Sequence, residues 1–168
     1  MNDPVSAPMD AQDYFELTQL YANYASAVSS GDWELWPEFF TEDCSYRLQP
    51  RENFERGLPL ATLSFESKGM LKDRVYGIRE TLFHDPYYQR NVCGTPVVRQ
   101  FTRKVDGDRF ECEANYAVFR TKLSELSAVF NVGRYIDLVV RTPQGLKFAS
   151  RQVVYDSEMI PNSIIYPI

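Results

Sequence analysis

The sequence predicts an α+β fold in which helices pack on one face of a curved antiparallel sheet. Apolar residues at helical spacing are concentrated in the first half of the chain, whereas from Val92 onward apolar and polar residues alternate as in long strands. Helices first and antiparallel strands afterwards favour separate layers over alternating strand–helix units. With 168 residues and no convincing linker, we expect one domain over residues 1–168.

Two helices are expected in the first half. Asp10 can cap a helix whose apolar positions follow the i, i+3, i+4 rule, namely Leu17, Leu20, Tyr21, Tyr24 and Val28. Gly31 ends it, and the aromatic segment that follows is kept short by Pro37, which a helix tolerates only in its first turn. Residues 68–82 return to helical period. His84-Asp85-Pro86 ends this helix, because a residue before proline is disfavoured in the helical region.

Strands are expected from three patterns. Residues 44–48 and 60–65 predict brief strands, separated by the polar stretch 49–53. Val105-Asp106-Gly107-Asp108 is a strong hairpin signal. The strand after it should have one dry face, formed by Phe110, Cys112, Ala114, Tyr116 and Val118.

A second hairpin permits a prediction of register. Thr142-Pro143-Gln144-Gly145 fits a three-residue loop with glycine at its left-handed position, which places Thr142 opposite Leu146. Counting back sets Arg141 against Lys147 and Asp137 against Arg151. The Asp137–Arg151 pair is then a structural cross-strand ion pair, worth up to ~1 kcal/mol if exposed.

Composition limits the chemistry of the chain. It has one histidine, His84, and three cysteines without metal-ligand spacing. A two-histidine, one-carboxylate iron site and a Rieske cluster both need a second histidine. The net charge of −5 argues against nucleic acid as a partner, and no run of ~20 apolar residues suggests a membrane span. The start, Met1-Asn2-Asp3-Pro4, does not resemble a secretion signal, and unpatterned cysteines suit a reducing cytoplasm.

Three segments are candidate functional sites. His84 beside Asp85 could be a general acid/base, although a histidine in a helix-ending turn is more often a structural hydrogen bonder. Tyr87-Tyr88-Gln89-Arg90 has residue types enriched at interfaces, and could equally pack its rings on the sheet. The tail 159–168 is apolar to its last residue and contains two prolines, so we expect Ile164, Ile165, Tyr166 and Ile168 to be buried against the domain or a partner.

Several blocks of sequence resemble the small (β) subunits of Rieske-type aromatic-ring-hydroxylating oxygenases. They are residues 73–79 (DRVYGIR), 84–92 (HDPYYQRNV), 133–137 (GRYID) and Ser150-Arg151 with Val153, Tyr155 and Asp156. Their order and spacing match from about Tyr14 to the end of the chain. Residues 46–54 and 155–163 are most similar to the small oxygenase subunits of salicylate 5-hydroxylases.

The resemblance implies a cystatin-like or nuclear-transport-factor-like cone. It also implies an α3β3 oxygenase in which the large (α) subunit carries the Rieske [2Fe-2S] cluster and the mononuclear Fe(II), with no cofactor and no catalytic residue in this chain. The whole enzyme would take electrons from NAD(P)H through a reductase and a ferredoxin, and would use O2 to convert salicylate to gentisate. Candidate interface residues are Arg74, Tyr87, Tyr88, Arg90, Arg134, Ile165 and Tyr166. Many relatives have a tryptophan and further arginines where this chain has residues 83–90.

A different class of function uses the same cone. Stand-alone isomerases and dehydratases place a carboxylate or histidine in its open mouth, and fold alone does not separate the two classes. Here His84 with Asp43 or Asp73 would form the acid/base pair, and a tyrosine would polarise a carbonyl.

Overall fold

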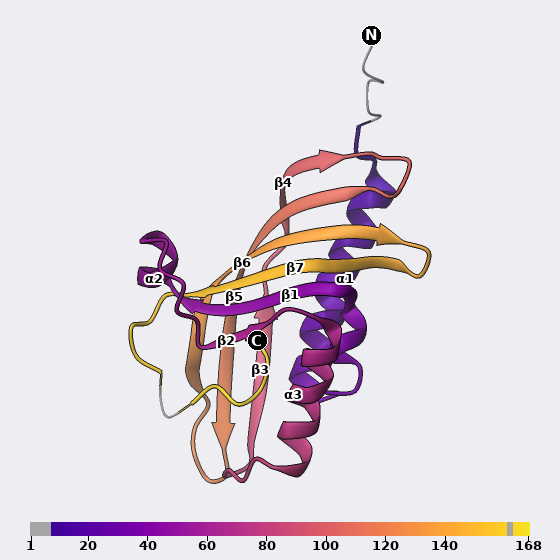
Figure 1. Cartoon of the computed structure of the whole chain (residues 1–168). Coiled ribbons are helices and arrows are strands. Elements are labelled where there is room, and N and C mark those ends of the chain that lie inside the picture. The colour runs from indigo at the N-terminus through magenta and orange to yellow at the C-terminus, as the bar shows by residue number, and fades with distance from the viewer. Residues whose placement is uncertain (1–7, 161–162) are drawn as a thin grey trace.

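The computed structural model describes residues 8–160 and 163–168 and shows one curved sheet with helices on one of its faces (Figure 1). The prediction that the chain starts without a secretion signal concerns residues 1–4, which lie outside the described residues, as do residues 161–162 of the tail. The elements are α1 (Ala11–Ser30), the 3-10 helix η1 (Trp36–Phe39), β1 (Phe40–Pro50), α2 (Arg51–Glu55), β2 (Leu63–Phe65), α3 (Lys68–Glu80), β3 (Tyr87–Cys93), β4 (Val97–Thr102), β5 (Arg109–Lys122), β6 (Ala128–Thr142) and β7 (Gly145–Tyr155).

Helix α1 begins and ends where the sequence predicts. The Asp10 side chain accepts a hydrogen bond from the backbone N–H of Asp13. In return, the Asp13 side chain accepts one from the backbone N–H of Asp10, so both of these backbone donors at the helix start are satisfied. Gly31 ends the helix in the left-handed conformation, with φ of 73°. The residues of the predicted apolar stripe are all buried against the sheet.

The strands follow the order β2-β1-β7-β6-β5-β3, and β4 pairs with the free part of β5 beside β3. All pairs are antiparallel except β1 with β7, which is parallel. Strands β5 and β6 bend strongly along their length, so the sheet wraps around α1 (Figure 1). Gly133 lies within β6, where a Cβ atom would overlap the carbonyl oxygen of Val154 on β7; only glycine permits this close approach.

The β6–β7 hairpin corrects the predicted register. Thr142 pairs with Gly145 instead of Leu146, and Arg141 faces Leu146 instead of Lys147. The loop is therefore one residue shorter than predicted. An irregularity between Leu138 and Val139 then shifts the register by one residue, because β7 contains an extra residue there. Asp137 consequently does lie opposite Arg151, although the counting that predicted it was wrong at the hairpin end.

An ionic cluster fixes the start of α1 to the far end of the sheet. The Arg141 guanidinium lies 2.8 Å from Asp13, 2.6 Å from Glu16 and 3.1 Å from Asp108. Arg103 adds contacts to Asp13 and Asp108. Because Asp13 and Asp108 are buried, these arginines supply the partners that buried carboxylates require.

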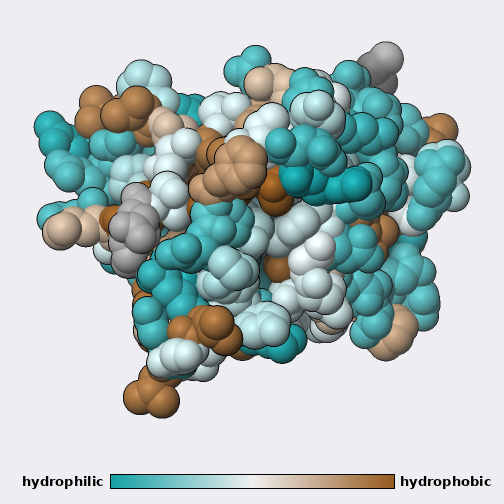
Figure 2. Space-filling model, turned by 90° about the horizontal axis from the view of Figure 1, so that it is seen from below, coloured by the Kyte–Doolittle hydropathy of each residue, from teal (hydrophilic) through white to brown (hydrophobic). Residues whose placement is uncertain are grey.

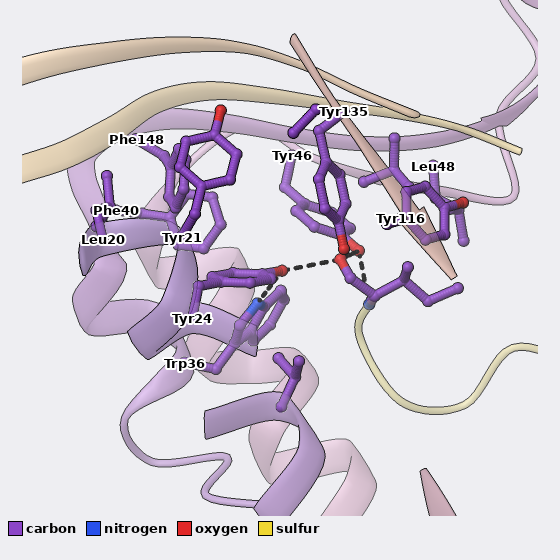
Figure 3. Packing of buried hydrophobic residues seen from close by; sticks show 14 of the residues in the cluster. Leu20, Tyr21, Tyr24, Trp36, Phe40, Tyr46, Leu48, Tyr116, Tyr135 and Phe148 are labelled. Atoms are coloured by element: carbon purple, nitrogen blue, oxygen red, sulfur yellow. Dashed lines mark hydrogen bonds between the residues drawn. The ribbon is translucent and has the colours of Figure 1, made fainter. Parts of the chain in front are cut away.

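The core between helices and sheet is rich in aromatic rings (Figure 3). Trp36 meets Tyr46 edge-on with ring centroids 5.4 Å apart, and Tyr24 meets Phe148 in the same way at 5.6 Å. Such edge-to-face pairs contribute about 0.5–1.5 kcal/mol beyond the area they bury. Ile164 and Ile168 of the tail belong to the same cluster, so the C-terminal segment forms part of the core.

Candidate functional site

The most polar feature of the interior is the ion pair between Asp137 of β6 and Arg151 of β7. The guanidinium donates to both carboxylate oxygens, at 3.0 Å and 2.7 Å, and both side chains are fully buried. The Tyr21 hydroxyl of α1 donates to the same carboxylate. The predicted pair is thus present, and it lies in the core. The exposed-pair magnitude does not apply, because removing one member leaves an uncompensated buried charge.

Aromatic rings surround the buried guanidinium. Its central carbon lies 3.8 Å from the ring centre of Phe148, 4.0 Å from that of Tyr135 and 4.2 Å from that of Tyr24. Burial raises the pKa of the Asp137 carboxyl, and the Arg151 charge opposes that rise. Burial and the Asp137 charge together raise the pKa of Tyr21 well above its ordinary value. The arrangement locks α1 to the middle of the sheet and keeps Tyr21 protonated.

The tail occupies the space between α1, α3 and the sheet. The hydroxyls of Tyr24 and Tyr46 donate to the Ile168 oxygen at 2.9 Å and 3.0 Å. Trp36 Nε1 donates to the Tyr24 hydroxyl at 3.1 Å, and the dashed lines of Figure 3 follow these bonds. Arg74 of α3 donates to the carbonyl oxygens of Ile164 and Ile165. Ile164 and Ile168 are buried, as predicted, and fill this space with apolar atoms.

His84 belongs to the support of the tail. Its Nε2 lies 3.1 Å from the Tyr166 hydroxyl and its Nδ1 lies 2.9 Å from the Asp85 carbonyl oxygen. The Tyr166 ring stacks on Trp33 at 4.8 Å and lies 4.8 Å from the Tyr87 ring. His84 is therefore one member of an aromatic cluster that holds Tyr166 half-buried.

The acid/base pair of the isomerase hypothesis is not assembled. Asp43 and Asp73 are exposed on β1 and α3, and in the described ranges neither forms a hydrogen bond or ion pair with His84. Likewise, over residues 8–160 and 163–168, no group of three or more His, Cys, Asp or Glu is placed to hold a metal ion. No helix in this part of the chain is long and apolar enough to cross a membrane.

The seven candidate interface residues fall into separate places. Four of them surround or belong to the tail: Arg74, Tyr87, Ile165 and Tyr166. Tyr88 and Arg90 point to solvent from β3, with Tyr88 81% exposed. Arg134 lies on β6 with its guanidinium 5.8 Å from the Phe54 ring. Whether any of them contacts another subunit stays a prediction.

Comparison with known proteins decides the family. The family model described as "Ring hydroxylating beta subunit" matches residues 23–162. The chain belongs to this family. The small subunit of anthranilate 1,2-dioxygenase from Burkholderia cepacia is 34% identical over 95% of this chain and 96% of its own length. A terephthalate 1,2-dioxygenase terminal oxygenase component subunit beta 1 from a Comamonas species is 28% identical over 91% of this chain and 97% of its own length.

Solved structures agree with this family and with the predicted cone. The β subunit of a putative aromatic-ring-hydroxylating dioxygenase from Novosphingobium aromaticivorans has a TM-score of 0.80 and 31% identity, and the match covers 92% of this chain and 96% of that one. A Nostoc punctiforme protein of cystatin-like fold has a TM-score of 0.59 at 15% identity, over 91% of this chain and 98% of that one, which shows the fold alone. The α+β cone with helices on one face of a curved sheet is confirmed. As a ring-hydroxylating β subunit, the chain is the small subunit of an aromatic oxygenase that pairs with an α subunit.

Sequence reasoning missed two kinds of residue. It did not find Tyr24 and Tyr46 as hydrogen-bond donors to the tail, because both tyrosines lie at ordinary core spacing. It also passed over Leu123 and Leu126, which are 86% and 93% exposed in the turn between β5 and β6. Two leucines inside an otherwise polar turn were a signal available in the sequence.

Proposed function

We propose that this chain is the small, non-catalytic oxygenase subunit of a salicylate 5-hydroxylase. In this proposal it supports an α3β3 assembly in the cytoplasm. The large subunit carries the Rieske [2Fe-2S] cluster and the mononuclear Fe(II), and a ferredoxin and a reductase deliver electrons from NAD(P)H. O2 then supplies one oxygen atom to the salicylate ring and the other to water, which gives gentisate.

The filled interior is the observation that best supports a non-catalytic role. Stand-alone enzymes of this fold need an open mouth with an acid/base group inside it. Here Ile164 and Ile168 fill the space between the helices and the sheet with apolar atoms, and Tyr24 and Tyr46 donate to the Ile168 oxygen. The buried acid, Asp137, is already paired with Arg151 and Tyr21. The isomerase or dehydratase alternative, with His84 as base, is therefore less favoured.

Substrate chemistry supports the assignment to salicylate. The anthranilate relative is named for a benzoate with an ortho amino group, and salicylate is the corresponding benzoate with an ortho hydroxyl group. The two acids have the same carboxylate and almost the same shape. A related oxygenase would need only a modest change in the large subunit's pocket to select one over the other.

Reconstitution tests this function. The chain should be co-expressed with the large subunit and supplied with reductase, ferredoxin, NAD(P)H and O2. We expect gentisate from salicylate, with turnover that depends on the large subunit. If the complex forms but oxidises anthranilate and leaves salicylate unchanged, the substrate assignment is wrong and the subunit role stands. If the isolated chain isomerises or dehydrates a carbonyl substrate, the non-catalytic role is wrong.

A further inference from the structure

One end of the sheet exposes a group of large apolar side chains. The turn between β5 and β6 presents Leu123 and Leu126, which are 86% and 93% exposed. On the strands next to it, Tyr88 is 81% and Val129 62% exposed. We name these four residues, Leu123, Leu126, Tyr88 and Val129, the hairpin patch. The molecule seen from this end has brown side chains standing out from a largely teal and white surface (Figure 2).

The register of the strands brings the patch together. Tyr88 pairs with Thr121, one residue from the end of β5, and Arg90, Phe119 and Val129 form one cross-strand row. Paired residues in a sheet point to the same face, and so do residues two apart in a strand. Tyr88 and Val129 therefore share the face of the sheet that α1 does not cover.

The turn that carries the two leucines is held in place. The backbone N–H of Glu125 donates to the Lys122 carbonyl oxygen, and the hydroxyls of Thr121 and Ser127 lie 2.7 Å apart across its base. Leu123 and Leu126 are thus presented to solvent at defined positions. An ordered apolar projection of this kind is typical of a protein-binding surface and is a liability on a free monomer.

Charge is separated along the molecule. The part of the sheet that carries the patch, residues 87–93 and 116–134, contains four basic residues, namely Arg90, Arg120, Lys122 and Arg134, and one acidic residue, Glu125. Its net charge is therefore +3. Arg90 shares the face of Tyr88 and Val129, whereas Arg120 and Lys122 pair with Gln89 and Tyr87 and point to the opposite face. Because the whole chain has a net charge of −5, the remaining residues have −8. A two-fold contact between two such ends would bring like charges together, which disfavours it.

We propose that the hairpin patch is the surface that binds the large oxygenase subunit, through its apolar side chains and the adjacent Arg90. This inference rests on the proposed function, since it locates the contact that pairing with an α subunit requires. Binding there requires a complementary surface on the large subunit, with apolar side chains and an acidic side chain facing Arg90. Such charge complementarity accelerates association and makes it sensitive to salt.

Two substitutions of exposed residues test the proposal. Leu126→Asp places a charge in the centre of the patch, and Val105→Asp is the matched control in the β4–β5 loop, where Val105 is also fully exposed. Neither removes a buried group, so the melting temperature of each isolated chain should equal that of the wild type. We expect Leu126→Asp to weaken binding to the large subunit at least about 30-fold, the threshold of an interface hot spot. Val105→Asp should bind within about two-fold of the wild type.

Arg90→Glu tests the contribution of the positive charge beside the patch. We expect slower association at low salt and a smaller dependence of the rate on salt. Equal affinity of Leu126→Asp and wild type for the large subunit overturns the proposal. The proposal is also overturned if Leu126→Asp abolishes self-association of the isolated chain but leaves binding to the large subunit unchanged, because the patch would then join copies of this chain. If the wild type binds no large subunit, the proposed function fails as well.

Discussion

Replacing Ile168 by alanine should destabilise the protein strongly, because the tail is part of its core. Ile168 is 0% exposed and lies within the main cluster of buried residues. Removing a buried isoleucine side chain down to the Cβ typically costs about 2–5 kcal/mol, including the cavity it leaves. For a domain of this size, each kcal/mol lowers the melting temperature by about 2–4 °C. We therefore expect Ile168→Ala to melt roughly 4–20 °C below the wild type.

Ile165→Ala is the matched control, since Ile165 is only half-buried three residues away. Urea unfolding followed by circular dichroism should give a clearly lower midpoint for Ile168→Ala and a much smaller change for Ile165→Ala. Deleting residues 163–168 should be more severe, because Tyr24 and Tyr46 then lose their acceptor as well as the apolar contacts. Equal midpoints for the wild type and Ile168→Ala would refute the reasoning.

Three further outcomes are expected. Arg151→Met should lower the free energy of unfolding by about 3–5 kcal/mol, because it leaves Asp137 buried without its cation. The double variant with Asp137→Asn should lose less stability than the sum of the two single variants. Strictly additive free energies from urea unfolding would contradict this. Burial raises the pKa values of Tyr24, Tyr46 and Tyr135 above the ordinary value of 10.0. The free energy of unfolding should therefore stay constant with respect to these groups below pH 10 and fall above it, because tyrosines ionise more easily in the unfolded chain. Tyrosinate absorbance that rises without unfolding would contradict this. His84→Ala should leave turnover of the assembled oxygenase within a few-fold, whereas a loss of ~10³-fold with assembly intact would indicate acid/base chemistry.

Local sequence signals predicted much of the fold. The cap at Asp10, the break at Gly31 and the apolar stripes located α1 and most of α3 because each depends on neighbours along the chain. Alternation located the dry face of β5, whose five predicted residues are all buried. The same signals placed helix and strand ends within a few residues: α3 ends at Glu80 rather than Leu82, and β2 starts at Leu63 rather than Leu60.

Non-local features were harder to predict. The short helix α2 was interpreted as a polar stretch, and the parallel pairing of β1 with β7 leaves no local pattern. The register of β6 and β7 depends on the length of the hairpin loop and on a bulge. The predicted loop was one residue too long and the bulge was not predicted, so the two errors cancelled at Asp137 and Arg151. Full burial of this pair was not predictable from two charged residues, since it depends on the aromatic rings brought from α1 and β7.

The sequence predicted which residues belong to the candidate site, but not how they are arranged. The apolar tail indicated burial, and Ile164 and Ile168 are buried. What the tail contacts depends on side chains from α1, β1, α3 and β3, which are distant in sequence. The candidate interface residues lie in three places for the same reason: around the tail, on the exposed face of β3 and, for Arg134, beside Phe54.

Native mass spectrometry of the chain co-expressed with its large subunit, with iron measured in each separated subunit, tests the central claim most directly. The account predicts one complex with equal numbers of both subunits and the mass of an α3β3 hexamer, and all iron in the large subunit. Stoichiometric iron bound to this chain, or a large subunit that is assembled and active without it, would contradict the account.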